Sequence, residues 1–277
     1  LVMRDSTIVL RELASGREIE VPSPASLVKS GLTYSVDGRW LFFLGADEDD
    51  ASRTDIYRTA EGAVPEVAVN ANGVKGPFVV SPDGSVLIYP LPAASPLRRP
   101  VSVPSKAAPS KTASAGRDAP AAAAAADPAR PNYAIFELAT GRSSSIRGSA
   151  LTLSADGRTL AYVGRDRGTP TIFVGPTTGP HAAVVRTEDR LDAPALSPDG
   201  RRLAWQRFVH DNWEVFVGDL NGSTLAGERR LTREVQHDVM PRFLTADRLL
   251  VLRGESRHRR SYLWGAEPLG RVRLFDN

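Results

Sequence analysis

The chain has 277 residues, of which 42% are hydrophobic and 24% are charged, a balance typical of globular proteins. It contains no cysteine and no run near the ~18 apolar residues of a membrane-spanning helix, so disulfides, thiolate metal sites and such helices are excluded. The formal net charge is +3, but residues 92–131 alone carry +4, so the remainder lacks the basic surplus of a nucleic-acid-binding protein.

The chain opens with two predicted strands, residues 6–13 and 17–21, joined by a glycine-containing turn. A Ser-Val-Asp-Gly turn follows at 35–38, before an apolar strand at 40–44 and a further strand at 55–57. This order then returns four times. The turns lie at 81–84, 154–157, 197–200 and, without glycine, 244–247. The apolar strands that follow them lie at 86–89, 159–163, 202–205 and 248–252. The further strands of these repeats lie at 133–136, 171–174, 214–217 and 261–264.

The turns share a chemistry that favours a tight reversal of the chain. In the two Ser-Pro-Asp-Gly copies, proline presets φ, aspartate can bond its own backbone, and glycine accepts a positive φ. Successive aspartates are 46, 73, 43 and 48 residues apart. A period in the forties matches the four-stranded blade of a propeller, and the longer spacing is one period plus an insertion.

The insertion spans residues 92–131 and includes six consecutive alanines at 121–126. Its 40 positions hold eight prolines and no aromatic side chain. Such a composition buries too little apolar surface to offset the entropy of ordering, so we expect a disordered Ala/Pro-rich loop within the domain.

The four in-phase Ser-x-Asp-Gly turns, each followed by an apolar strand and an "Ile-Tyr" type strand, resemble the TolB-type, WD-like propeller repeat. The resemblance covers almost the whole chain and implies one all-β domain over residues 1–277, a β-propeller of four-stranded antiparallel blades. We expect about five complete blades and an N-terminal half blade that lacks its first two strands. A β-sandwich with coincidental turns is the alternative fold.

The two ends of the repeat array do not complete one another. The strands at 261–264 and 271–275 already finish the last blade, so nothing in the sequence pairs with the half blade at the other end. We therefore expect an incompletely closed ring, and a parent protein that continues beyond residue 277.

The usual catalytic signatures are missing. The chain has no Gly-x-Ser-x-Gly, His-Glu-x-x-His, Walker A or dinucleotide-binding motif. We expect no catalytic residues, cofactor or metal site in this chain alone.

Candidate binding residues lie in the loops that should emerge opposite the Asp-Gly turns. The guanidinium groups of arginine bind carboxylates and phosphates through paired hydrogen bonds. A His-Asp pair can ligate a metal ion or form a hydrogen-bonded pair that orients neighbouring loops. The candidates are His210, Asp211, His237, Asp238, Arg257, His258 and Arg259.

The resemblance implies two functions. One is a non-catalytic, TolB-like propeller that binds a protein or peptide. The other is a propeller that gates substrate entry to a serine peptidase, whose α/β-hydrolase domain would lie beyond residue 277. Attachment to another envelope enzyme, such as a metallopeptidase, is a third reading. The resemblance also implies export to a bacterial periplasm, with the cytoplasm as the alternative.

Overall fold

The computed structural model describes residues 2–4, 7–22, 27–47, 54–61, 63–71, 73–74, 76–91, 132–233, 236–254, 260–265 and 271–273. They form 23 strands in six antiparallel sheets and contain no helix. No described segment is therefore a helix able to cross a membrane. The all-β class and the four-stranded repeat are confirmed.

The sheets follow one another along the chain as blades. The N-terminal blade contains β1 (Val2–Arg4), β2 (Thr7–Arg11) and β3 (Glu18–Glu20). Blade 1 contains β4 (Leu27–Tyr34), β5 (Leu41–Asp47), β6 (Thr54–Thr59) and β7 (Glu66–Val69). Blade 2 contains β8 (Val79–Val80), β9 (Val86–Pro90), β10 (Tyr133–Glu137) and β11 (Ser143–Ile146). 

The remaining three blades repeat the same up-and-down order. Blade 3 contains β12 (Ser149–Leu153), β13 (Thr159–Asp166), β14 (Thr169–Pro176) and β15 (Ala182–Arg186). Blade 4 contains β16 (Leu191–Leu196), β17 (Arg202–Val209), β18 (Asn212–Asn221) and β19 (Thr224–Arg230). Blade 5 contains β20 (Asp238–Phe243), β21 (Arg248–Arg253), β22 (Arg260–Gly265) and β23 (Arg271–Arg273).

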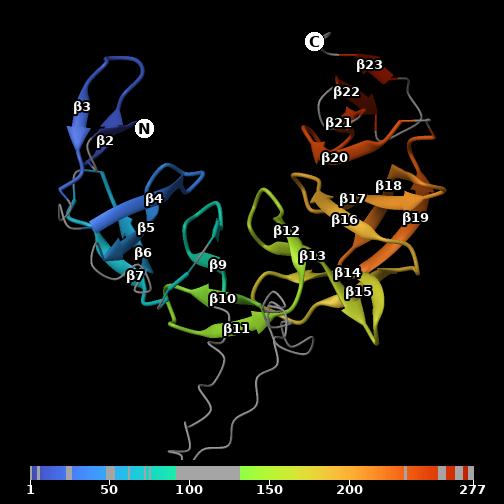
Figure 1. Ribbon diagram of the computed structural model, residues 1–277, viewed down its shortest axis with the longest axis horizontal. Coiled ribbons are helices and arrows are strands. Elements are labelled where there is room, and N and C mark those ends of the chain that lie inside the picture. The colour runs from blue at the N-terminus through green and yellow to red at the C-terminus, as the bar shows by residue number, and fades with distance from the viewer. Residues whose placement is uncertain are drawn as a thin grey trace, which may run out of the picture.

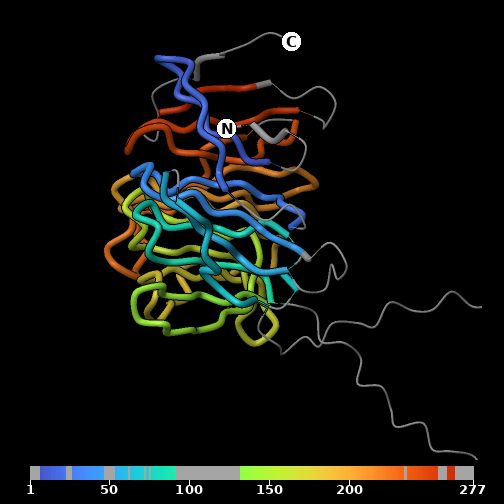
Figure 2. The backbone as a smooth tube through the Cα atoms, turned by 90° about the vertical axis from the view of Figure 1, so that its left-hand side faces the viewer, coloured from blue at the N-terminus to red at the C-terminus, as the bar shows by residue number. Residues whose placement is uncertain are grey.

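The blades stand side by side along an open arc, with the N-terminal blade at one end and blade 5 at the other (Figure 1). Five apolar clusters join consecutive blades, and within the described residues none joins the N-terminal blade to blade 5. A closed ring of six blades would need a sixth interface. The expectation of an incompletely closed ring is therefore confirmed, and the side view shows the same stacking of sheets (Figure 2).

Alternate side chains of each second strand face different neighbours. In β5, Leu41 and Phe43 pack with the N-terminal blade, whereas Phe42 and Leu44 pack with blade 2. All four are buried, and the two phenylalanines are fully so. This explains why the run is continuously apolar: both faces of the strand lie inside the protein, and each large side chain contributes about 1.5–3 kcal/mol.

The Asp-Gly turns have one geometry. In the turn of blade 2, the Ser81 hydroxyl donates to Asp83 Oδ1 (2.7 Å) and accepts from the Val86 amide (2.9 Å), while the Gly84 amide donates to the Ser81 carbonyl (2.8 Å). Gly84 has φ 72°, which glycine adopts without strain. The same contacts recur in the turns of blades 1, 3 and 4.

These turns lie on one rim and contact one another. The Asp37 amide donates to the Pro82 carbonyl (3.2 Å), which joins the turns of blades 1 and 2. A Cβ on Gly157 would lie 2.5 Å from Pro82 Cδ, and one on Gly200 would lie 3.7 Å from Ser154 Cβ. The four turns therefore mark equivalent corners of neighbouring blades.

Two parts of the fold differ from the sequence-based expectation. The N-terminal sheet has three strands instead of two, because β1 pairs with β2 through Val2↔Val9 and Arg4↔Thr7. A three-residue strand is too short to show an alternating pattern. In the turn at 244–247, Thr245 replaces serine and donates to Asp247 Oδ1 (2.6 Å), while the Leu244 amide donates to the Arg248 carbonyl (2.9 Å), so this turn is shorter. The insertion at 92–131 lies outside the described residues.

Candidate functional site

The innermost strands of four blades carry a β-bulge near their first residues. The register shifts between Ser30 and Thr33 in β4 and at the corresponding places in β12, β16 and β20. Glycine provides the positive φ in β4, but the other three strands use Ala150 (49°), Ala193 (43°) and Met240 (53°). The left-handed conformation costs an L-residue roughly 1–2 kcal/mol. Bulges of this kind re-aim side chains and are common beside binding sites.

The three non-glycine bulges line one hollow of about 690 Å³. The strands that carry them lie on the concave side of the arc (Figure 1). The hollow lies where β12, β16 and β20 of blades 3, 4 and 5 come together. Its size is that of a small-ligand or short-peptide site. The lining also includes Leu151, Thr152, Arg190, Asp192, Pro194, Gln206, Trp213, His237, Val239, Pro241, Arg242 and Gly254.

One wall of the hollow is a cation held against aromatic rings. The Arg190 guanidinium carbon lies 5.3 Å from the centre of the Trp213 ring and 5.6 Å from that of Phe208. These two rings meet edge to face with centroids 5.3 Å apart. Stacking occupies the faces of a guanidinium and leaves its N–H edge for in-plane hydrogen bonds. Arg190 makes no ion pair within the described part of the chain.

The floor contains a buried side-chain amide whose oxygen has a hydrogen-bond partner and whose nitrogen has none among the described residues. Gln206 is 6% exposed, and its Oε1 accepts a hydrogen bond from the Met240 amide (2.9 Å), which joins blade 4 to the bulge of blade 5. This contact fixes the orientation of the side-chain amide. Gln206 lines the hollow, and no described residue accepts a hydrogen bond from its Nε2. A ligand that supplies an acceptor to this donor would add a hydrogen bond whose geometry the protein has already fixed.

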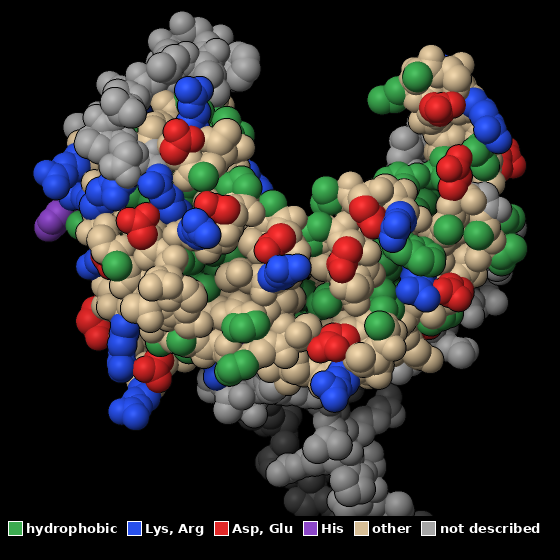
Figure 3. All heavy atoms as spheres, turned by 180° about the vertical axis from the view of Figure 1, so that it is seen from behind, with side chains coloured by type: hydrophobic (Ala, Val, Ile, Leu, Met, Phe, Trp, Pro, Cys, Tyr) green, Lys and Arg blue, Asp and Glu red, His purple; other side chains and the backbone are tan. Residues whose placement is uncertain are grey.

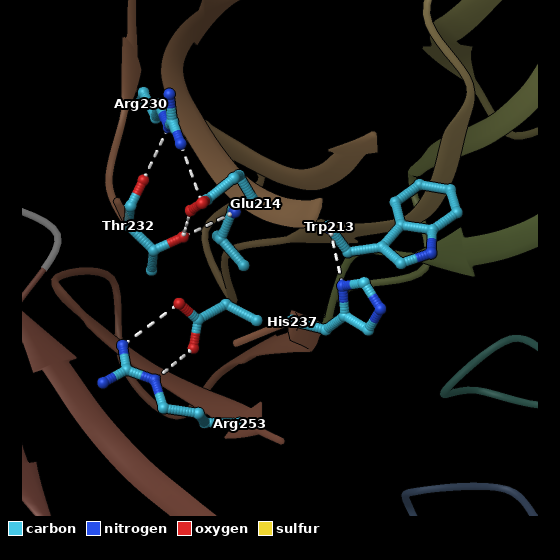
Figure 4. Close-up of polar contacts among 8 residues, drawn as sticks. Trp213, Glu214, Arg230, Thr232, His237 and Arg253 are labelled. Carbon is cyan, nitrogen blue, oxygen red and sulfur yellow. Dashed lines mark hydrogen bonds and ion pairs between the residues drawn. The ribbon is translucent and has the colours of Figure 1, made fainter. Parts of the chain in front are cut away.

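Behind the hollow, blades 4 and 5 each hold a buried carboxylate against an arginine of the same blade (Figure 4). Glu214 accepts from Arg230 Nη2 (2.7 Å) and from the Thr232 hydroxyl (2.5 Å). Asp238 forms two hydrogen bonds with Arg253, at 2.9 and 3.1 Å. Burial raises the pKa of Asp238, and nearby Glu214 raises it further, against the lowering effect of Arg253 and Thr232.

The structure separates the predicted site residues. His210 and Asp211 are exposed and form the two central positions of the β17–β18 hairpin, with φ 48° and 66°, a type I′ turn. His237 lines the hollow, and its Nδ1 accepts a hydrogen bond from the Trp213 amide (3.1 Å). In the neutral tautomer, Nε2 of His237 therefore carries the hydrogen. Figure 4 shows His237 beside Trp213.

Asp238 does not line this hollow. We expected Asp238 on the binding face, but its carboxylate is fully buried against Arg253, because Asp238 points between the blades. It can position His237 but cannot contact a ligand there. Arg257, His258 and Arg259 lie outside the described residues, so their role stays a prediction.

Arg190, Gln206 and Trp213 were missed by sequence reasoning. Each is a single residue without a local motif, and they meet only because neighbouring blades pack together. Arg190 directly precedes the first strand of blade 4, and Trp213 follows the hairpin that contains His210, which places both at the predicted face. Within the described residues, no three His, Asp or Glu side chains are grouped as a metal site would need. 

Comparisons with protein-family models and with curated protein sequences gave no match. Solved structures do match. A TolB structure from Agrobacterium tumefaciens aligns with a TM-score of 0.53 and 16% sequence identity, over 97% of this chain and 88% of that one. The chain has a TolB-type β-propeller fold.

The same TolB-type propeller also matches parts of larger enzymes. A prolyl endopeptidase aligns with a TM-score of 0.61 and 16% identity, over 91% of this chain and 36% of the enzyme. An acylaminoacyl peptidase from Pyrococcus horikoshii aligns with a TM-score of 0.58 and 11% identity, over 98% of this chain and 41% of the enzyme. At these identities, the likeness establishes the fold alone.

Proposed function

We propose that the chain is a non-catalytic propeller module that binds a protein or peptide segment on its concave side. The observation that carries the proposal is the hollow between β12, β16 and β20, of about 690 Å³. Apolar side chains such as Leu151, Pro194 and Val239 provide surface for burial, while Arg190 and Gln206 provide donors. A few polar groups placed in an apolar hollow are typical of a binding site.

The size of the hollow, about 690 Å³, favours a short segment of chain over a folded globular ligand inside it. The concave side opens between the two ends of the arc, as the view from behind shows (Figure 3). On the face drawn there, Lys/Arg and Asp/Glu side chains are interspersed without a large patch of one sign. Local contacts in the hollow, more than a long-range field, would then select the ligand.

The test is equilibrium binding of a mixed library of short peptides to the chain and to two tryptophan variants. Met240→Trp enlarges an exposed side chain at the hollow and keeps the backbone demands of the bulge. Val36→Trp enlarges an exposed side chain on the rim of the Asp-Gly turns. We expect Met240→Trp to lose binding and Val36→Trp to retain it. Equal binding by all three proteins would contradict the proposal.

The second candidate is a propeller that gates substrate entry to a peptidase. It is supported by the alignment of nearly the whole chain with 36% of a prolyl endopeptidase and 41% of an acylaminoacyl peptidase. This function predicts that the product of the complete gene hydrolyses the peptides that bind the hollow. Binding without hydrolysis by that product would favour the first function.

We also propose an exported, periplasmic location, which rests on the resemblance to TolB, with the cytoplasm as the alternative. Fractionation of cells that express the complete gene tests it. Recovery with periplasmic markers would support export, and recovery with cytoplasmic markers would exclude it.

A further inference from the structure

We infer that the hollow recognises a peptide carboxylate next to an apolar side chain, with Arg190 as the anchor of the carboxylate. The inference rests on the proposed peptide-binding function and names the chemistry of the ligand. Either a chain terminus or an Asp or Glu side chain supplies such a carboxylate. 

The charges that line the hollow favour an anion. Arg190 and Arg242 are exposed there, and neither forms an ion pair within the described part of the chain. The one carboxylate of the lining, Asp192, accepts a hydrogen bond from the Ala193 amide (2.8 Å). With His237 neutral, the lining carries a net charge of +1. 

The geometry of Arg190 favours a planar anion over a point charge. Contact with the Trp213 and Phe208 rings restricts the guanidinium before a ligand arrives, so less side-chain entropy is lost on binding. Its free N–H edge forms two parallel bonds with a carboxylate, which a lysine cannot reproduce.

A second, independent feature also calls for an acceptor. Gln206 is more than nine-tenths buried, it lines the hollow, and its Nε2 has no acceptor among the described residues. A carboxylate bound to Arg190, or a peptide carbonyl beside it, supplies the missing acceptor. The Trp213 ring and the buried Val239 and Pro241 then provide the surface for the neighbouring apolar side chain.

Three probe peptides test the inference by calorimetry. They are acetyl-Ala-Ala-Phe with a free carboxylate, the same peptide as its amide, and acetyl-Ala-Asp-Phe amide. Binding of the first alone indicates a terminal carboxylate, and binding of the third without the second indicates an acidic side chain. We expect the amide without aspartate to bind roughly tenfold or more weakly than at least one of the others.

Variants locate the effect at Arg190. Arg190→Ala should remove the difference between acid and amide, Arg190→Lys should restore it only in part, and Asp192→Asn should tighten binding of the acid. Arg158→Ala, which removes an exposed arginine on the opposite rim, should change nothing. 

The outcomes separate this inference from the proposed function. If acid and amide bind equally and Arg190→Ala has no effect, while Met240→Trp still abolishes binding, the carboxylate anchor is wrong and the peptide-binding function stands. If none of the probes and no library peptide binds, both are wrong.

Discussion

The Arg253 guanidinium donates two hydrogen bonds, of 2.9 and 3.1 Å, to the Asp238 carboxylate, inside the interface between blades 4 and 5. The Asp238 side chain is fully buried, and that of Arg253 is 7% exposed. Asp238 is the first residue of β20, the strand that carries the Met240 bulge, and directly follows His237, so this pair holds both hollow-lining residues in place.

Removing one partner of this pair should be costly. Arg253→Met leaves the Asp238 carboxylate buried without its cation, and we expect a loss of about 3–5 kcal/mol in the free energy of unfolding. The double variant Asp238→Leu with Arg253→Met should lose less than the single one. Urea denaturation measures both. 

An exposed pair provides the control. Arg186 and Asp166 form an ion pair of 3.0 Å with side chains 49% and 36% exposed. Arg186→Met should cost less than about 1 kcal/mol. Equal losses for Arg253→Met and Arg186→Met would contradict the structural role of the buried pair.

The turn aspartates make the protein sensitive to acid. Hydrogen bonds from Ser35, Ser154 and Ser197 lower the pKa of Asp37, Asp156 and Asp199. A folded-state pKa below the unfolded value of ~3.9 stabilises the fold above that pH, and the contribution is lost as the pH falls through the folded-state pKa. Asp238, whose pKa is raised by burial, acts in the opposite sense and loses its contribution as the pH rises.

Asp156→Asn tests this dependence, because an asparagine oxygen can still accept from Ser154 and from the Arg158 amide. Unfolding free energies at about pH 5 and about pH 3 should differ less in the variant than in the parent protein. An unchanged difference would show that the turn carboxylate does not contribute.

Glycines in the turns differ in what surrounds them. Gly157 and Gly141 have similar φ values, 71° and 67°, but a Cβ on Gly157 would lie 2.5 Å from Pro82 Cδ, whereas nothing lies within 4 Å of one on Gly141. Gly141→Ala should therefore cost only the roughly 1–2 kcal/mol of the left-handed conformation. Gly157→Ala should cost more, because two blades must separate. Equal losses in thermal unfolding would argue against contact between the turns.

The positive φ at the Ala150 bulge predicts an unusual effect of glycine on stability. The φ of 49° is unfavourable for alanine and free for glycine, whereas glycine costs roughly 0.5–1 kcal/mol of entropy elsewhere in a strand. Ala150→Gly should leave the unfolding free energy unchanged or raise it. Ala161→Gly, at a regular position of β13, should lower it clearly. A loss at both positions would contradict the bulge.

Local patterns predicted the fold because a propeller repeats the same local physics. The apolar run at 41–44 indicated a strand buried on both faces, and the turn aspartates were expected to bond their own backbone, as Asp83 does with the Ser85 amide. β1 was not predictable, because three residues show no periodicity.

The hollow was only partly predictable. His237 was expected on the face opposite the Asp-Gly turns, and it lines the hollow. Gln206 and Met240 are 34 residues apart and meet only through packing of the blades. The bulges at Ala150, Ala193 and Met240 could not be predicted from the sequence either, because alanine and methionine rarely adopt a positive φ, whereas glycine, as at Gly31, often does. Asp238 was expected on the binding face, because the sequence does not reveal that its carboxylate pairs with Arg253 of the neighbouring strand.

The most direct test of the account is photo-crosslinking of a bound peptide, followed by mass spectrometry of the modified residues. Binding on the concave side predicts crosslinks at residues 150–152, 190–195 and 237–242, with loss of these crosslinks in Met240→Trp. Crosslinks confined to the outer strands β15 and β19, and unchanged in Met240→Trp, would contradict it.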